Sequence, residues 1–499
     1  MIKYVLPLEQ TQSRPCLARG GTPGVRRVAA AAKHRCEGWI DIILKTCKTW
    51  ALLSLLGFVM LGVSCSEPAE TEGVEIELWT LALRPRFTTY IEDVIGTFEQ
   101  AHPGVKVRWV DVPFDALSRK LIAAAAAGQA PDVVNISDLQ YARFASLGAT
   151  RDLTPLLNFD PTSVYLEGAL APAQIDGKLG ALPWYLSTQV RFINTQLLKA
   201  GGLDADSVGS DWAGLMTQAR AYYQETGGFY FSVPLAVESE LPVMLIADGK
   251  PPFTESDGRL RADLTRGEVV SFVQAWVDLY REGILPREAA TAGHAHVVEL
   301  YQNGQIAVAV TGANFLSRIA SSAPDIFEAT AVRPTATGEL NRSHIAVMFL
   351  SVTSTSKHPQ EAAALAAWLT NPQNQLAFCQ LVNILPSTPG VLDDSLFDAP
   401  TAEHGTAETK IAAARSISAR SLRSAVAFTP ALGTWPDLRR SFDEGIKSAL
   451  LDGRDVQETL KDIEAEWNQI LDAAIPATLD AVPQPGPADD KTMSRGTQP

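Results

Sequence analysis

The chain has 499 residues, of which 46% are hydrophobic and 20% are charged, and its formal net charge is −14. This composition excludes a largely disordered chain and a fibrous repeat, and at about 150 residues per domain the length predicts two large units or three smaller ones. The acidic balance argues against a nucleic-acid-binding protein, because nucleic acid selects basic surfaces.

The basic front of the chain predicts an export signal. Lys45 and Lys48 precede an apolar run at residues 50–63, which is shorter than the roughly 20 residues that a membrane-spanning helix needs. The run ends in Leu-Gly-Val-Ser-Cys at 61–65, which resembles the bacterial lipobox. That resemblance implies that Cys65 is diacylated and begins the mature protein, with residues 1–64 as leader. The alternative is a membrane anchor that happens to meet a cysteine.

The cysteines and the flanking segments are consistent with this interpretation. Residues 1–40 fit no targeting pattern, and we expect them to be either unstructured or translated upstream of a true start near the 40s. Residues 65–73 are polar and suit a tether. After lipidation of Cys65 only Cys379 remains free, and we expect it to be a buried, small apolar side chain. The leader contains the other three cysteines, Cys16, Cys36 and Cys47.

The body opens with alternating strand and helix patterns. Strand patterns at residues 74–83, 105–109 and 131–136 are separated by helix patterns at 88–101 and 118–127. A βαβαβ order predicts a parallel sheet with helices on both faces, and therefore an α/β fold.

The alternation continues to about residue 475. Residues 477–499 have several prolines and no apolar period, and we expect a disordered tail. Further strands are expected at 306–310 and 345–352, and further helices at 211–224, 265–281, 360–369, 374–382, 437–451 and 455–474.

Six stretches in a fixed order carry a family resemblance. The chain resembles the extracellular solute-binding lipoproteins of ABC importers, in the group that binds sugars and oligosaccharides (solute-binding protein family 1). Its departures from the family pattern, at Ile193, Ala309 and Asn314-Phe315, leave the identity of the ligand open. The stretches are ELWTLAL with VIGTFEQAHPGVKVRWVDV, LIAAAAAGQAPDVVNIS, IDGKLGALPWYLSTQVRFINTQLLKAGGL, LYQNGQIAVAVTGANF, SKHPQEAAALAAWLTNPQNQLAF and TWPDLRRSFDEGI.

The resemblance implies a type II periplasmic-binding-protein-like fold of two α/β lobes joined by hinge crossovers. By analogy, residues 74–187 and 330–385 form lobe 1, and residues 188–329 and 386–476 form lobe 2. The ligand lies between the lobes at the carboxyl ends of strands, and closure of the hinge is what the importer's membrane subunits recognise.

A sugar site needs flat aromatic rings for the CH faces and polar side chains for the hydroxyls. Residues of these kinds follow several of the expected strands, and family members often stack a sugar at the position of Trp435. The candidate ligand-binding residues are Trp79, Arg84, Asp138, Trp184, Tyr185, Glu238, Asn314 and Trp435. The remaining tryptophans of the body are expected in the core: Trp109, Trp212, Trp276, Trp368 and Trp467.

Rival chemistries have weaker support. His294 and His296 with Glu299 suggest a zinc site, but on a helix positions i and i+2 diverge, so a surface loop is the favoured interpretation. Tyr222-Tyr223 could ligate iron, but they lie within a helix pattern and fit the core better. No P-loop, GxSxG elbow or reactive cysteine is present in the sequence.

We therefore expect a lipid-anchored, extracytoplasmic carbohydrate receptor of an ABC importer. It would be monomeric, with no catalysis, no cofactor and no metal, and its partners would be a saccharide, the permease and the membrane. Two alternatives stay open: the same scaffold with a polyol phosphate, polyamine or peptide, or a glycan-binding lipoprotein without a transporter.

Overall fold

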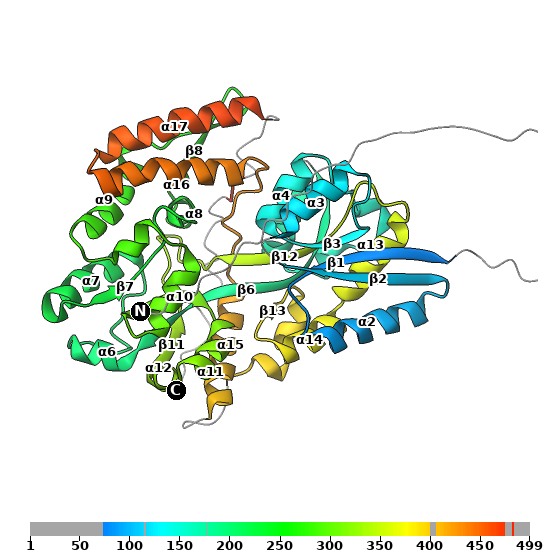
Figure 1. Cartoon of the computed structure of the whole chain (residues 1–499), viewed down its shortest axis with the longest axis horizontal. Helices are drawn as coiled ribbons and strands as arrows, with labels where there is room; N and C mark the ends of the chain where they lie inside the picture. The colour runs from blue at the N-terminus through cyan, green and yellow to red at the C-terminus, as the bar shows by residue number, and fades with distance from the viewer. Residues whose placement is uncertain (1–72, 114–115, 176, 400–405, 475–481, 484–499) are drawn as a thin grey trace, which may run out of the picture. The chain divides into compact units, whose positions relative to one another are not determined.

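The computed structural model describes residues 73–113, 116–175, 177–399, 406–474 and 482–483 (Figure 1). The expected leader, Cys65 and residues 65–72 of the tether lie outside these residues, as does most of the expected tail. Val482, within that tail, is buried against a core, so the expectation of disorder does not hold at this residue. No helix in the described ranges is both long and apolar enough to cross a membrane.

The expected βαβαβ opening is confirmed. Strand β1 (Val74–Leu81) lies between the parallel strands β2 (Val105–Val112) and β3 (Val133–Ser137). The connections are α2 (Thr88–Ala101), whose buried face includes Ile91, Val94 and Phe98, and α3 (Leu117–Ala126).

Strand β6 (Ala181–Asn194) belongs to both halves of the sheet. Its first half pairs antiparallel with β12 (Ile345–Val352), from Ala181 opposite Ser351 to Thr188 opposite Ile345. Its second half pairs antiparallel with β10 (Ile306–Gly312) and with β11 (Thr330–Pro334). Within the described residues the sheet has nine strands, ordered β2-β1-β3-β12-β6-β10-β7, with β11 and β13 also pairing with β6.

The other elements cover the sheet or extend it. The remaining strands are β7 (Phe229–Phe231) and β13 (Leu385–Pro386), with the hairpins β4 (Gln174–Ile175) to β5 (Lys178–Leu179) and β8 (Phe253–Ser256) to β9 (Arg259–Ala262). The remaining α-helices are α4 (Asp138–Ser146), α5 (Glu167–Leu170), α6 (Thr195–Ala200), α7 (Trp212–Thr226), α8 (Leu241–Ala247), α9 (Gly267–Arg281), α10 (His294–Gln302), α11 (Phe315–Ser322), α12 (Pro324–Ala329), α13 (Pro359–Leu369), α14 (Pro372–Leu381), α15 (Ala407–Leu422), α16 (Trp435–Asp452) and α17 (Val456–Ala473).

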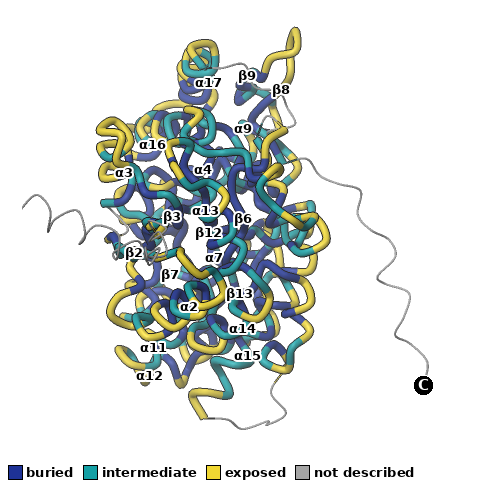
Figure 2. Tube along the Cα trace, turned by 90° about the vertical axis from the view of Figure 1, so that its right-hand side faces the viewer, coloured by how far each residue is buried: buried dark blue, intermediate teal, exposed yellow. Residues whose placement is uncertain are grey.

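Two large hydrophobic cores lie on the two halves of the sheet. The first core surrounds β1, β3, β12 and the first half of β6, and the second core involves α7, α9, α16 and α17. A smaller cluster lies against β10 and the second half of β6. Buried residues follow the strands and the inner faces of the helices (Figure 2).

The cores divide the chain somewhat differently from the expected lobes. Strand β11 pairs with the second half of β6, although residues from 330 onward were expected in lobe 1. Val391, Leu392 and Phe397 belong to the first core, although residues 386–476 were expected in lobe 2. Both differences concern short segments whose partners lie far away in the sequence.

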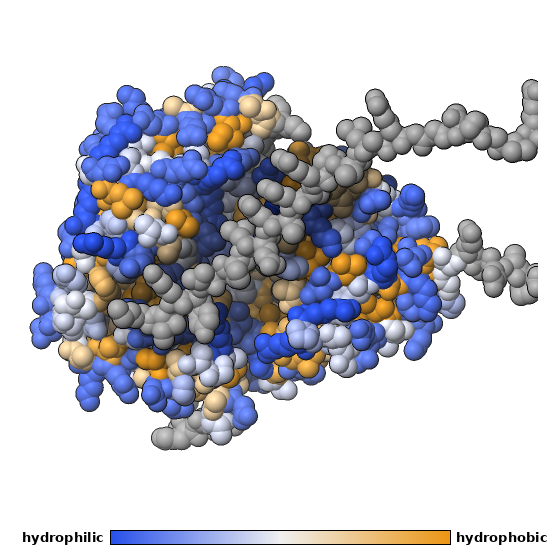
Figure 3. Space-filling view, in the orientation of Figure 1, coloured by the Kyte–Doolittle hydropathy of each residue, from blue (hydrophilic) through white to orange (hydrophobic). Residues whose placement is uncertain are grey.

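The helix pair α16 and α17 illustrates how the second core is built. The surface over these two helices is mostly hydrophilic (Figure 3), whereas their inner faces carry Trp435, Phe442, Ile463 and Trp467. The Trp467 ring stacks on Phe253, with 5.4 Å between centroids. Trp467, Trp276 and Trp212 are buried as expected, whereas Trp109 and Trp368 are half-buried against the first core.

We expect Trp467→Ala to lower the free energy of unfolding by about 3–5 kcal/mol, because it leaves a large cavity in the second core. Leu451→Ala is the matched control: its side chain is 52% exposed on the neighbouring helix, and a change within about 0.5 kcal/mol is expected. Urea unfolding followed by circular dichroism measures both. Equal losses in the two variants would contradict this description of the core.

Candidate functional site

Polar side chains from both halves of the sheet gather where strands and helices end. We call them the polar cluster: Asp138, Glu238, Glu240, His294, Thr311, His344, Arg439 and Asp443. Asp138 begins α4 directly after β3, Thr311 lies near the end of β10, and His294 begins α10. Glu238 and Glu240 lie between β7 and α8, His344 directly precedes β12, and Arg439 and Asp443 lie one turn apart on α16.

The loop that carries the two glutamates is fixed from α16. Glu238 has a φ of +54°, a left-handed conformation that is uncommon outside glycine. Its N–H and that of Ser239 donate to the two carboxylate oxygens of Asp443, over 2.9 and 3.0 Å. Arg439 Nε donates to the Ser239 carbonyl over 3.2 Å. These bonds hold a strained loop in one conformation, a feature that often marks functional sites.

His294 connects the same loop to the sheet. Its backbone N–H donates to Glu238 Oε2 over 3.1 Å, Nδ1 lies 3.4 Å from Glu240 Oε1, and Nε2 lies 3.0 Å from Thr311 Oγ1. Burial disfavours charge on the imidazole, but the hydrogen bond and charge of Glu240 outweigh it and raise the pKa of His294. Burial alone would raise the pKa of Glu240. The hydrogen bond and charge of His294 outweigh this effect, so the pKa of Glu240 is lowered.

Asp138 reaches the cluster from the side of the first core. The capping box of Ser137 and Gln140 starts α4, so that the Asp138 carboxylate lies at the helix N-terminus. Oδ1 accepts the Leu139 N–H over 2.8 Å, whereas Oδ2 is buried and makes no hydrogen bond. Burial raises the pKa of Asp138 to about 6, and nearby backbone N–H groups and the charge of Arg439 oppose this shift only in part.

His344 and an ion pair complete the contact between the two sides. Burial lowers the pKa of His344 to about 4, so the ring is neutral at pH 7, and its Nδ1 accepts the Phe428 N–H over 3.0 Å. Nearby, Arg143 on α4 lies 3.9 Å from Asp437 on α16. Acceptors and donors from both cores therefore meet here, an arrangement suited to binding a solute rich in hydroxyl groups.

The structure brings two of the eight candidate residues, Asp138 and Glu238, into the polar cluster. Three others, Trp79, Trp184 and Trp435, are at most 4% exposed and lie within the cores. The Trp435 ring packs near Phe253 and Trp467. In this conformation none of these three rings offers a face for stacking, and their role in binding stays a prediction.

The last three candidates lie outside the polar cluster. Arg84 is exposed, with its guanidinium 4.0 Å above the Trp109 ring. Tyr185 is half-buried on β6, where burial and then the charge of Asp111 raise its pKa. Asn314 is exposed just before α11. Each follows or lies on a strand as expected, and their contact with a ligand is untested.

Sequence reasoning missed Glu240, His294, Thr311, His344, Arg439 and Asp443 as members of the site. His294 was considered as a metal ligand or, preferably, as part of a surface loop, but it begins helix α10. Its ring turns to Glu240, whereas His296 pairs with Glu299 over 3.1 Å. No group of three His, Cys, Asp or Glu residues in the described ranges is placed to hold a metal ion. One signal was available, since Arg439 and Asp443 are spaced i, i+4 and share a helix face.

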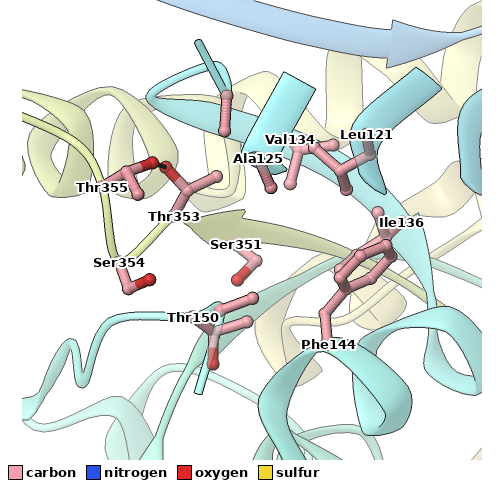
Figure 4. Close-up of a pocket in the computed structure, with 12 residues that line it drawn as sticks. Leu121, Ala125, Val134, Ile136, Phe144, Thr150, Ser351, Thr353, Ser354 and Thr355 are labelled. Carbon is pink, nitrogen blue, oxygen red and sulfur yellow. Dashed lines mark hydrogen bonds between the residues drawn. The ribbon is translucent and has the colours of Figure 1, made fainter. Parts of the chain in front are cut away.

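A cavity of about 30 Å³ lies apart from the polar cluster, in the first half of the sheet (Figure 4). Aliphatic side chains such as Leu121 and Val134 face hydroxyls such as Ser351 and Thr353 across it. Both hydroxyls are already bonded, Ser351 to the Gly180 carbonyl and Thr353 to the Pro131 carbonyl. The cavity has room for about one water molecule, which is too little for a saccharide.

We expect Asp138→Asn to stabilise the protein at pH 8 and to leave its stability unchanged at pH 4. The folded pKa of about 6 lies above the unfolded value of about 3.9, so the stability that Asp138 contributes falls as the pH rises between them. The gain at pH 8 should be about 1–3 kcal/mol. Asp160→Asn is the control, because exposed Asp160 also accepts a backbone N–H, from Thr162. Thermal unfolding at the two pH values measures both, and equal behaviour of the variants would refute the assignment.

Comparison with known proteins places the chain. The family model for bacterial extracellular solute-binding proteins matches residues 93–406. The crystal structure of a candidate oligosaccharide periplasmic-binding protein from Synechococcus sp. MITs9220, also solved with zinc, is 33% identical, with a TM-score of 0.72 over 80% of this chain and 99% of that one.

Two sequence relatives extend over most of the body. An uncharacterised lipoprotein of Streptomyces antibioticus is 24% identical over 88% of this chain and 95% of its own length. The galactooligosaccharide-binding protein of Bacillus subtilis is 23% identical over 70% of this chain and 83% of its own. The expected α/β fold of the periplasmic-binding type is thereby confirmed, and the chain belongs to the family of bacterial extracellular solute-binding proteins.

Proposed function

We propose that this protein captures a sugar or oligosaccharide outside the cytoplasm and delivers it to an ABC permease. The observation that carries the proposal is the polar cluster, in which Asp138 from the side of the first core faces Arg439 from the side of the second. A carboxylate that accepts and a guanidinium that donates suit the vicinal hydroxyls of a sugar. The galactooligosaccharide-binding relative and the candidate oligosaccharide-binding structure support the same ligand class.

The cluster suggests how capture works. In this proposal the two cores are two lobes, and β6 is one of the segments on which they hinge. A ligand that bonds both Asp138 and Arg439 binds the closed arrangement more tightly than the open one. This difference in binding free energy sets how far the equilibrium shifts toward closure. Binding in this way requires no covalent chemistry, so we propose a receptor without catalytic activity.

A polyamine is the second candidate. The cluster contains four carboxylates, on Asp138, Glu238, Glu240 and Asp443, against Arg439 and the protonated form of His294, and burial lowers the pKa of His344 so that it is neutral at pH 7. This excess of negative charge favours a cation over a polyol phosphate.

A thermal-shift screen over mono- and oligosaccharides, spermidine and glycerol phosphate tests the ligand class. A ligand at 100 times its Kd should stabilise the wild type by about 2.7 kcal/mol. We expect a saccharide to produce this shift and Arg439→Ala to weaken its affinity by about tenfold or more, which is about 1.4 kcal/mol. Arg440→Ala is the control, because exposed Arg440 pairs with Asp437 instead. A shift with spermidine alone, or equal losses in both variants, would refute the saccharide site.

We also propose that Cys65 carries the lipid that anchors the protein. Two acyl chains hold a protein durably at a bilayer, whereas one does so only marginally. Cys65→Ser should therefore move the exported protein from the detergent phase to the aqueous phase in Triton X-114 partitioning. Cys379→Ser, which changes a buried thiol, should leave the partitioning unchanged. An unaltered detergent-phase fraction for Cys65→Ser would contradict the anchor.

A further inference from the structure

Glu238 and Glu240 lie on one short loop, residues 238–240, whose backbone and side chains are held by different elements. The backbone is bound by Asp443 and Arg439 of α16. The two carboxylates instead point to His294 at the start of α10. We propose that His294 is a positioning residue, which aims the Glu238 and Glu240 carboxylates at the bound solute without contacting the solute itself. This inference rests on the function proposed above.

Three polar groups of His294 have partners at the same time. The His294 backbone N–H holds Glu238, its Nδ1 holds Glu240, and its Nε2 is 3.0 Å from the fully buried hydroxyl of Thr311. The ring also lies 6.3 Å from that of Phe315, on the next helix. With both ring nitrogens occupied, the imidazole has no free polar atom for a ligand, but its orientation is fixed.

Glu238 also packs closely on Gly293. A Cβ at position 293 would lie 2.3 Å from Glu238 Oε2, so the Glu238 carboxylate would have to move away from its present place. The glycine before His294 therefore allows the carboxylate to reach the backbone N–H. Glu238 itself has a left-handed backbone conformation, with a φ of 54°.

The charges around His294 couple its protonation to the two carboxylates. The groups that face His294 are Glu238 and Glu240 from the loop, with uncharged Thr311 and Phe315 from β10 and α11. Arg439 of α16 and neutral His344 act on the same Glu240 from the other side. The protonated imidazole attracts both carboxylates more strongly than the neutral one, since it pairs with Glu240 and its charge also acts on Glu238. Loss of its proton as the pH rises above the raised pKa of His294 should therefore loosen the carboxylates.

The affinity for a saccharide, measured by calorimetry from pH 6.5 to pH 9, tests this role. Wild type should bind about five- to tenfold more weakly at the alkaline end, since a charge-assisted hydrogen bond is about twice as strong as a neutral one. His294→Gln keeps a hydrogen-bonding side chain but cannot be protonated, so it should bind weakly at pH 6.5 and show no alkaline loss. The control is His296→Gln, two residues along α10, whose partner is Glu299 outside the loop. It should follow the wild type at every pH.

A second measurement uses the wild-type protein, so it tests the role of His294 even if His294→Gln folds poorly. Because coupling is reciprocal, a saccharide that binds the protonated form more tightly must raise the pKa of His294. The imidazole signal, followed by NMR with and without saccharide, should titrate at higher pH in the complex, and that of His296 should not shift. An unchanged His294 titration, or a His294→Gln variant with wild-type affinity and alkaline loss, would overturn the inference. Failure of the wild type to bind any saccharide would instead refute the proposed function.

Discussion

The continuity of strand β6 is the constraint on which the rest of the structure depends. Fourteen residues without a break complete one half of the sheet with β12 and the other half with β10 and β11. Because side chains alternate along a strand, a slip of one residue would misplace hydrophobic residues in both cores at once. A single strand thus sets the register of two cores, and any movement between them must bend this strand and the other crossing segments.

This connection also explains why buried charges occur where they do. Polar residues at the ends of β3 and β10, in the loop between β7 and α8, and before β12 converge with one face of α16. Burial of so many ionisable groups is costly unless they are hydrogen-bonded, and nearly all are: Asp443 accepts two N–H groups, and Glu240 pairs with His294. Asp138 Oδ2 is the exception and makes no bond. A buried acceptor without a donor is an energetic cost that a ligand hydroxyl could remove.

The local parts of this account could be read from the sequence, and the long-range parts could not. Periodicity gave the opening βαβαβ order, because α2 and α3 bury faces that recur every three to four residues. The position of Asp138 after β3 followed from the same reasoning. By contrast, Trp435 lies between Pro430 and Pro436, at a position where family members often stack a sugar, yet Trp467 and Phe253 enclose its ring in the core. His294 and Arg439 were missed as site residues because their partners lie more than 50 residues away in the sequence.

The central claim is that one solute bonds to groups from both cores at the polar cluster. A crystal structure of the protein with the saccharide that stabilises it most tests this claim directly. We predict that hydroxyl groups of the saccharide lie within hydrogen-bonding distance of both Asp138 and Arg439, and that Glu238 keeps its left-handed conformation. A saccharide bound to one core only, or bound away from both of these residues, would contradict it.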